Sequence, residues 1–202
     1  MHMVCETVRS AVAVASLLAA LPVPARAGDA HAAEPPPYVF SDELGGFSVT
    51  VLGGIGSRDS PVRIKQILRT ASPVTLVVRA ARPVNPLGAP ADFATGTIHV
   101  VLDVTNDSGI PWVGLELELQ ERLEQPSIFG DGLSFDQRRI ARDGAHSNAF
   151  ANARREFEPY DRLLFEDGSL DPKNHAEFRF LITDLTPTRV FYVKLDPRIP
   201  SS

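Results

Sequence analysis

Residues 97–120, TIHVVLDVTNDSGIPWVGLELELQ, contain the pattern that decides the fold class. Leu115, Leu117 and Leu119 alternate with Glu116, Glu118 and Gln120, so that every second side chain is apolar. This period of two places one face of a β-strand in a core and the other face in water. Residues 97–104 form a second strand candidate, and the intervening Asn106-Asp107-Ser108-Gly109 has the residue types of a tight hairpin turn.

The same alternation recurs on both sides of this stretch. Phe47, Val49 and Val51 alternate with Ser48 and Thr50, and Phe178, Phe180 and Ile182 stand at the same spacing. Residues 62–68, 74–80 and 189–195 are further strand candidates. Since no helical spacers separate these segments, the sequence predicts an all-β fold, an antiparallel β-sandwich of about seven or eight strands.

Residues 134–157 do not follow the period of two. Phe150, Ala153 and Phe157 fall at helical spacing after Ser147, which could cap a helix. The pattern predicts a long excursion between strands that contains one or two short helices. Long excursions in compact domains often carry function.

The N-terminal residues predict export. Arg9 precedes an apolar run over residues 11–21, and Ala25-Arg26-Ala27 follows as a cleavage site. The run is shorter than the roughly 20 residues that a membrane-spanning helix needs. We therefore expect a signal peptide at 1–27, a flexible proline-rich leader at 28–46, and one domain at 47–202. The mature chain would have no transmembrane segment and would be periplasmic or secreted, in a bacterium.

Cleavage would change the composition of the protein. Loss of Arg9, Arg26 and Glu6 takes the formal net charge from −5 to −6, and loss of Cys5 and both Met residues removes all side-chain sulfur. One Cys excludes an internal disulfide framework and paired-cysteine metal motifs. The acidic balance also argues against nucleic acid as a partner, because neutralising phosphates requires clustered Lys and Arg.

No catalytic residue can be assigned from motifs. The Gly53-Gly54-Ile55-Gly56 run lacks the third glycine of a dinucleotide loop and is interpreted as a turn. The sequence contains no G-x-S-x-G, H-E-x-x-H or phosphate-binding P-loop motif.

The segment Asp167-Gly168-Ser169-Leu170-Asp171 is a candidate calcium loop. Oxygen ligands at alternate positions, here Asp167, Ser169 and Asp171, can surround a hard cation. Pro172 and Phe178 depart from the EF-hand pattern, so the alternative is a solvated acidic turn without a cofactor.

The arginines of the 134–157 excursion are a candidate anion site, because guanidinium groups bind carboxylates and phosphates bidentately. The alternative is pairing with the acidic side chains of Glu116, Glu118, Glu121 and Glu124. The candidates are Arg138, Arg139, Arg142, Arg154 and Arg155. The partners expected for such a surface are an envelope protein or an anionic glycan.

Residues 100–119, VVLDVTNDSGIPWVGLELEL, contain the pattern T-N-x-[ST]-G-x-x-W. This stretch resembles a hairpin of a loose group of exported bacterial β-rich proteins. The resemblance implies a β-fold and export, and it implies no activity. Trp112 is the only tryptophan, and we expect it to fill the core between two sheets.

Together these features predict an exported β-sandwich that acts in binding or surface interaction. One alternative is a hydrolase or lyase with its site in the 134–157 excursion, built from Asp136, Glu158 and Asp161 near Arg154, Arg155 and Tyr160. Another is an accessory subunit of an exported complex, for which an exposed apolar face or an unpaired edge strand would be the sign.

Overall fold

The computed structural model describes residues 35–136, 144–156 and 159–201. By contacts, the chain divides into residues 1–31 and 32–202, and the described residues belong to the second unit. Their only helical element is the 3₁₀ turn η1 (Phe129–Asp131). The twelve strands are β1 (Tyr38–Ser41), β2 (Phe47–Gly53), β3 (Val62–Leu68), β4 (Val74–Ala80), β5 (Thr97–Asn106), β6 (Gly114–Gln120), β7 (Leu133–Phe135), β8 (His146–Ser147), β9 (Phe150–Glu156), β10 (Arg162–Gly168), β11 (His175–Asp184) and β12 (Val190–Arg198).

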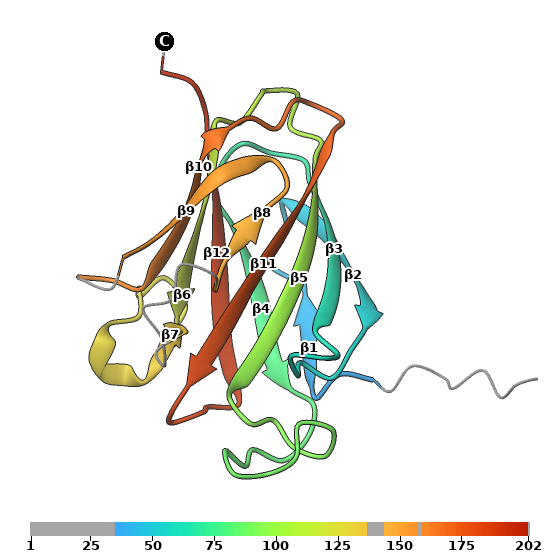
Figure 1. The fold of residues 1–202 in the computed structure, drawn as a ribbon, viewed down its shortest axis with the longest axis vertical. Helices are drawn as coiled ribbons and strands as arrows, with labels where there is room; N and C mark the ends of the chain where they lie inside the picture. The colour runs from blue at the N-terminus through green and yellow to red at the C-terminus, as the bar shows by residue number, and fades with distance from the viewer. Residues whose placement is uncertain (1–34, 137–143, 157–158, 202) are drawn as a thin grey trace, which may run out of the picture. The chain divides into compact units, whose positions relative to one another are not determined.

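The strands form two sheets of six. Sheet A has the order β1-β4-β12-β6-β10-β9. Sheet B has the order β2-β3-β5-β11-β7, and β8 also pairs with β11. Figure 1 shows sheet B in front, with β5 and β11 crossing the centre of the view. All neighbours are antiparallel except β3 and β5, which run parallel.

One apolar core lies between the sheets. Sheet A contributes Leu115, Leu117 and Leu119 of β6, and sheet B contributes alternate residues such as Phe178 of β11. Phe178 contacts Phe165 edge-on, at 4.8 Å between ring centroids. Trp112 is fully buried in this core, as expected from the sequence.

The all-β prediction is confirmed, and all seven predicted strand segments are strands. The predicted strand number was too low, because β1, β7, β8, β9 and β10 lack clear alternation. The leader prediction also extended too far, since residues 38–41 already form β1 and Tyr38 is 3% exposed. Tyr38 is held by tertiary contacts: its Oη accepts a hydrogen bond from the Gly96 amide at 2.8 Å.

The prediction of helices in residues 134–157 was wrong for the described part of that interval, which contains β7, β8 and β9. Phe150 stands at helical spacing from Ala153, but β9 pairs with β10 from Gly168↔Phe150 to Arg162↔Glu156. Residues 137–143 and 157–158 lie outside the described residues. Pairing with a strand later in the chain outweighs a weak local preference.

The turn at residues 106–109 connects the two sheets and does not close a hairpin. The strand before it, β5, lies in sheet B, and the strand after it, β6, lies in sheet A. The buried Asn106 side chain donates to the carbonyls of Ile110 and Leu170, at 2.8 and 2.9 Å. Trp112 Nε1 donates to Ser108 Oγ at 3.1 Å. The Asn, Ser and Trp of the motif therefore hold a crossover between sheets.

Candidate functional site

A pocket of about 500 Å³ lies on the outer face of sheet B. Along the edge of β11, strand β8 pairs with Phe178 and Arg179, and strand β7 pairs with residues 182–184. The pocket opens in the gap between these two pairings. Phe180 and Leu181 lie between these pairings and line the pocket. We call it the β5–β11 pocket; it is lined by Arg58, Pro61, His99, Val100, Val101, Asp136, Gly144, His146, Arg179, Phe180 and Leu181.

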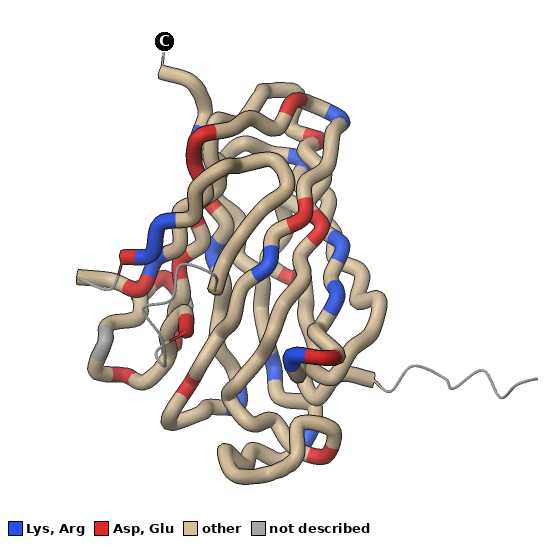
Figure 2. The backbone as a smooth tube through the Cα atoms, viewed as in Figure 1, with Lys and Arg blue, Asp and Glu red and all other residues tan. Residues whose placement is uncertain are grey.

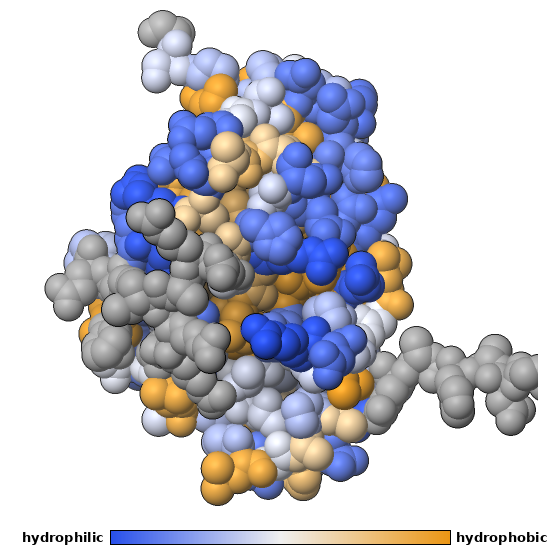
Figure 3. All heavy atoms as spheres, in the orientation of Figure 1, coloured by the Kyte–Doolittle hydropathy of each residue, from blue (hydrophilic) through white to orange (hydrophobic). Residues whose placement is uncertain are grey.

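Register explains how the sequence brings these side chains together. Arg63 of β3, Val101 of β5, Arg179 of β11 and His146 of β8 are successive Cα partners across sheet B. His99 and Leu181 form the next pair on the same face, two residues further along their strands. Figure 2 shows the basic and acidic positions on this face of the molecule, and in Figure 3 hydrophilic residues border an apolar area at its centre.

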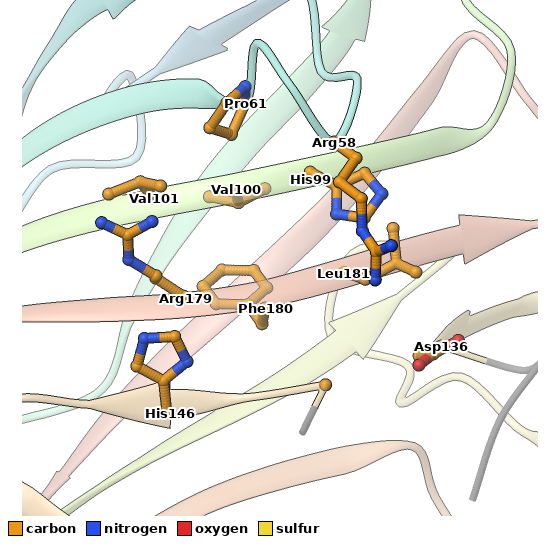
Figure 4. Close-up of a pocket in the computed structure, with 11 residues that line it drawn as sticks. Arg58, Pro61, His99, Val100, Val101, Asp136, His146, Arg179, Phe180 and Leu181 are labelled. Carbon is orange, nitrogen blue, oxygen red and sulfur yellow. The ribbon is translucent and has the colours of Figure 1, made fainter. Parts of the chain in front are cut away.

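The pocket is strongly biased toward basic residues. Arg58, His99, His146 and Arg179 line it, whereas Asp136 is the one acidic residue among the lining residues that the structure describes. Figure 4 shows Arg58 beside His99, Arg179 beside Val101, and Asp136 apart from both arginines. This bias is notable in a chain whose formal net charge is −5.

The pKa of His99 is shifted by the groups around it. Burial, followed by the nearby Arg58 guanidinium, lowers the pKa of His99. Asp136 and Asp59 act in the opposite direction and are outweighed. A bound anion would favour the protonated imidazole and raise this pKa.

Backbone geometry at the pocket edge is strained. Asp136 has a φ of 46°, a left-handed conformation that a side chain with a Cβ rarely adopts. Its amide donates to the Leu181 carbonyl at 3.1 Å, and its own carbonyl accepts from Arg155 Nη1. Contacts from strands β9 and β11 thus hold Asp136 in place.

The predicted arginine site is not assembled as one group among the described residues. Arg154 is exposed on β9 and pairs with Glu156 and Glu166. Arg155 is half-buried, and its Nη2 donates to Ser134 Oγ at 3.1 Å. Arg138, Arg139 and Arg142 lie outside the described residues.

The acidic side chains of β6 form ion pairs with basic side chains of β10 and β12. Arg162 Nη2 lies 2.7 Å from Glu118, and Arg198 Nη2 lies 2.6 Å from Glu116. Lys194 Nζ lies 3.7 Å from Glu118. Sequence reasoning named the acidic residues of this face but not their partners, since the partners depend on strand order.

The carboxylates of the predicted enzyme site are dispersed. Asp136 lines the β5–β11 pocket. Asp161 is fully buried and accepts from Ser134 Oγ at 2.5 Å. The guanidinium of Arg162 lies 5.3 Å from the centre of the exposed Tyr160 ring, and Glu158 lies outside the described residues.

The candidate calcium loop follows β10. Asp167 Oδ2 accepts from Asn152 Nδ2 at 2.5 Å, and Asp167, Ser169 and Asp171 are all exposed. Leu170 between them is buried and bridges to Trp112. Across the described residues, no group of three or more His, Cys, Asp or Glu side chains is placed to hold a metal ion. Calcium binding here stays a prediction, and a rise in thermal midpoint with millimolar Ca²⁺ would support it.

Sequence reasoning missed the pocket because its members come from distant segments. His99 and Val101, and likewise Arg179 and Leu181, stand two apart in alternating strands, which marks each pair as sharing one face. Nothing in that spacing says that β5 and β11 are neighbours. Arg58 follows the glycine turn at residues 53–56, and only the folded chain brings it beside His99.

Comparison of the chain with family models, curated proteins and solved structures finds no match. Among the described residues, no helix is both long and apolar enough to span a bilayer.

Proposed function

We propose that this chain is an exported β-sandwich protein that binds a small anionic ligand in the β5–β11 pocket. The observation that carries the proposal is the convergence of Arg58, Arg179, His99 and His146 on one pocket, where Asp136 is the single acidic residue among the described lining residues. Arginine binds carboxylate and phosphate groups through bidentate, charge-assisted hydrogen bonds. The signal-peptide pattern at residues 1–27 supports export.

The arginines of the pocket are available for a ligand. Arg58 is exposed and makes no hydrogen bond or ion pair with any residue in the described ranges. Arg179 Nε donates to Glu177 at 2.7 Å, and no second described residue pairs with that guanidinium. Dispersal of Asp136, Asp161 and Tyr160 favours binding over the hydrolase or lyase alternative.

Isothermal titration of the chain lacking residues 1–27 with inorganic phosphate and with an oligogalacturonate tests the proposal. Binding of either probe, weakened roughly ten-fold or more by Arg58→Ala or Arg179→Ala, supports it. Arg189→Ala is the matched control, because Arg189 is exposed and lies outside the pocket. Equal binding by the pocket variants and the control would contradict the proposal, and so would the absence of binding by phosphate, by the oligogalacturonate and by every carboxylate named in the next subsection.

A second candidate function, an accessory subunit, rests on a different surface. An apolar groove of about 420 Å³ lies between the edge strands β1 and β2 and is lined by residues that include Val39 and Leu52. These two side chains are 52% and 58% exposed. A concentration-dependent dimer in sedimentation, abolished by Leu52→Glu, would show that this groove is a protein-binding surface for a second copy of the chain; a monomer at all concentrations would count against that use of the groove.

A further inference from the structure

The basic groups of the β5–β11 pocket lie at two ends of it. Val101 and Arg179 face each other in one cross-strand pair, and His99 and Leu181 in the next pair on that face. Two residues along a strand correspond to about 7 Å. Figure 4 shows Arg179 and His146 toward one end and Arg58 with His99 toward the other.

The first end is formed by Arg58 and His99. Arg58 extends from the turn between β2 and β3, and its positive charge lowers the pKa of His99. The acidic groups that face His99 are Asp59 and Asp136. The described residues offer Arg58 no ion pair, so an anion placed here would meet an uncompensated guanidinium.

The second end is formed by Arg179 and His146, which are Cα partners in neighbouring strands. Glu177, two residues before Arg179 on β11, accepts a hydrogen bond from Arg179 Nε at 2.7 Å. That bond fixes one edge of the planar guanidinium, and the two terminal nitrogens remain for a ligand. Arg63, the Cα partner of Val101 on β3, adds a further positive charge to this row.

Each end of the pocket also has an apolar side chain, Val101 opposite Arg179 and Leu181 opposite His99 (Figure 4). The side chain of Val101 is 4% exposed although it stands on the outer face of the sheet. Leu181 is half-buried and lies diagonally across from Val101 on the neighbouring strand. A ligand that fills the pocket must therefore present charge at its ends and an uncharged middle to these two side chains.

Building on the proposed function, we propose that the ligand is a dianion whose two anionic groups are joined by a short apolar spacer. A linear aliphatic dicarboxylate is the simplest member of this class. One carboxylate would bind Arg58 and His99, and the other would bind Arg179 and His146. The spacer would pass between Val101 and Leu181.

Titration with succinate, adipate, suberate and sebacate, each beside the monocarboxylate of equal length, tests this inference. We expect one dicarboxylate of intermediate length to bind at least ten-fold more tightly than its matched monocarboxylate, because a second charge-assisted contact forms. Arg58→Ala and Arg179→Ala should each reduce that dicarboxylate to the affinity of the monocarboxylate. Arg189→Ala should leave the length optimum unchanged.

Several outcomes separate the inference from the proposed function. Equal affinity for mono- and dicarboxylates, with sensitivity to both arginines, would overturn the two-ended ligand and leave anion binding standing. An affinity that rises steadily with the length of the carbon chain of the ligand, and that neither Arg58→Ala nor Arg179→Ala changes, would also overturn the inference. If neither phosphate, oligogalacturonate nor any carboxylate binds, the inference and the proposed function both fail. Far-ultraviolet circular dichroism of each variant confirms folding. Arg179→Lys retains the positive charge on β11, where alanine also removes the hydrogen bond to Glu177.

Discussion

At the scale of single residues, Asp161 is a buried acid whose ionisation affects stability. It is fully buried and accepts one hydrogen bond, from Ser134. Within the described structure its second oxygen, Oδ2, has no hydrogen-bond partner. Burial raises the pKa of Asp161 from 3.8 to about 6, against the opposing effects of Ser134 and Arg155. The folded state therefore favours the protonated acid.

Replacing Asp161 with Asn should stabilise the protein at neutral pH. Because the pKa is raised on folding, the free energy of unfolding falls as pH rises from 3.8 to about 6, and the loss is complete above that range. Asp161→Asn removes this loss and should gain about 2 kcal/mol at pH 7.5 and almost nothing at pH 3.5. Urea unfolding of both proteins at the two pH values measures the difference. A variant equally destabilised at both would show that the acid is ionised without penalty.

A second effect of single residues is the proton uptake of His99 on ligand binding. Since burial and Arg58 lower its pKa, the ring is mainly neutral at pH 7, and a bound anion should draw a proton onto it. Anion affinity should rise as the pH falls through the His99 pKa. Calorimetry in buffers of different ionisation enthalpy measures the protons taken up, and His99→Gln should lower that number. An unchanged number would place the ligand away from His99.

At the scale of elements, the 106–112 crossover depends on one amide side chain. Asn106 is fully buried, and its Nδ2 bonds two carbonyls while its Oδ1 accepts from the Ser108 amide at 3.0 Å. Asn106→Ala should lower the free energy of unfolding by about 2–4 kcal/mol, because it leaves buried carbonyls without a donor.

The neighbouring residue gives the matched control for this crossover. Asp107 pairs with the exposed Lys173, so Asp107→Ala should cost at most about 1 kcal/mol. Chemical denaturation of both variants makes the comparison. Similar losses would mean that the crossover is held by its backbone alone.

Strand β3 contains a polar side chain where the pattern calls for an apolar one. Gln66 shares the inner face with Val62, Ile64 and Leu68 and is 0% exposed. Neither polar atom of its amide has a hydrogen-bond partner in the described part of the protein. Gln66→Met keeps the shape and removes the unsatisfied groups, so it should stabilise the fold by about 1–3 kcal/mol. Thermal unfolding checks this, and a lower midpoint would show that the amide is hydrogen-bonded in solution.

At the scale of the whole molecule, the outer faces of the two sheets carry different arrangements of charged side chains. On the outer face of sheet A, the carboxylates of β6 are matched by Arg162, Lys194 and Arg198. On the outer face of sheet B, the described lining of the β5–β11 pocket has two arginines and two histidines and one acidic residue, Asp136. A net charge of −5 is therefore compatible with a locally basic surface, which the proposed anion binding would require.

Export can be tested on the intact chain. We expect expression in a Gram-negative bacterium to yield a product that begins at Gly28, because Ala25-Arg26-Ala27 provides the small residues of a cleavage site. Mass spectrometry of the periplasmic and medium fractions measures the N-terminus. Ala27→Gln should block cleavage, whereas Ala30→Gln, outside the site, should not. A full-length cytoplasmic product from the unmodified chain would contradict the prediction.

The sequence by itself determined the fold class and seven of the strands. Alternation in segments such as residues 62–68 and 74–80 reflects a local requirement, one buried face and one solvated face, which each strand must satisfy wherever it lies. Strands β8 and β9 carry no such pattern because they bury few side chains. Strand β1 buries Tyr38 and Phe40, but its outward residue Val39 is also apolar, so the sequence shows no alternation there.

Only the tertiary structure decided which strands are neighbours, and with them the site. The parallel pairing of β3 with β5 and the separation of β5 from β6 into different sheets follow from packing over long chain distances. The β5–β11 pocket needs Arg58, His99, His146 and Arg179 from four segments in one register. Because a shift of one residue would turn the residues of a strand to its other face, the pocket is a property of strand order and register, which spacing along the chain does not encode.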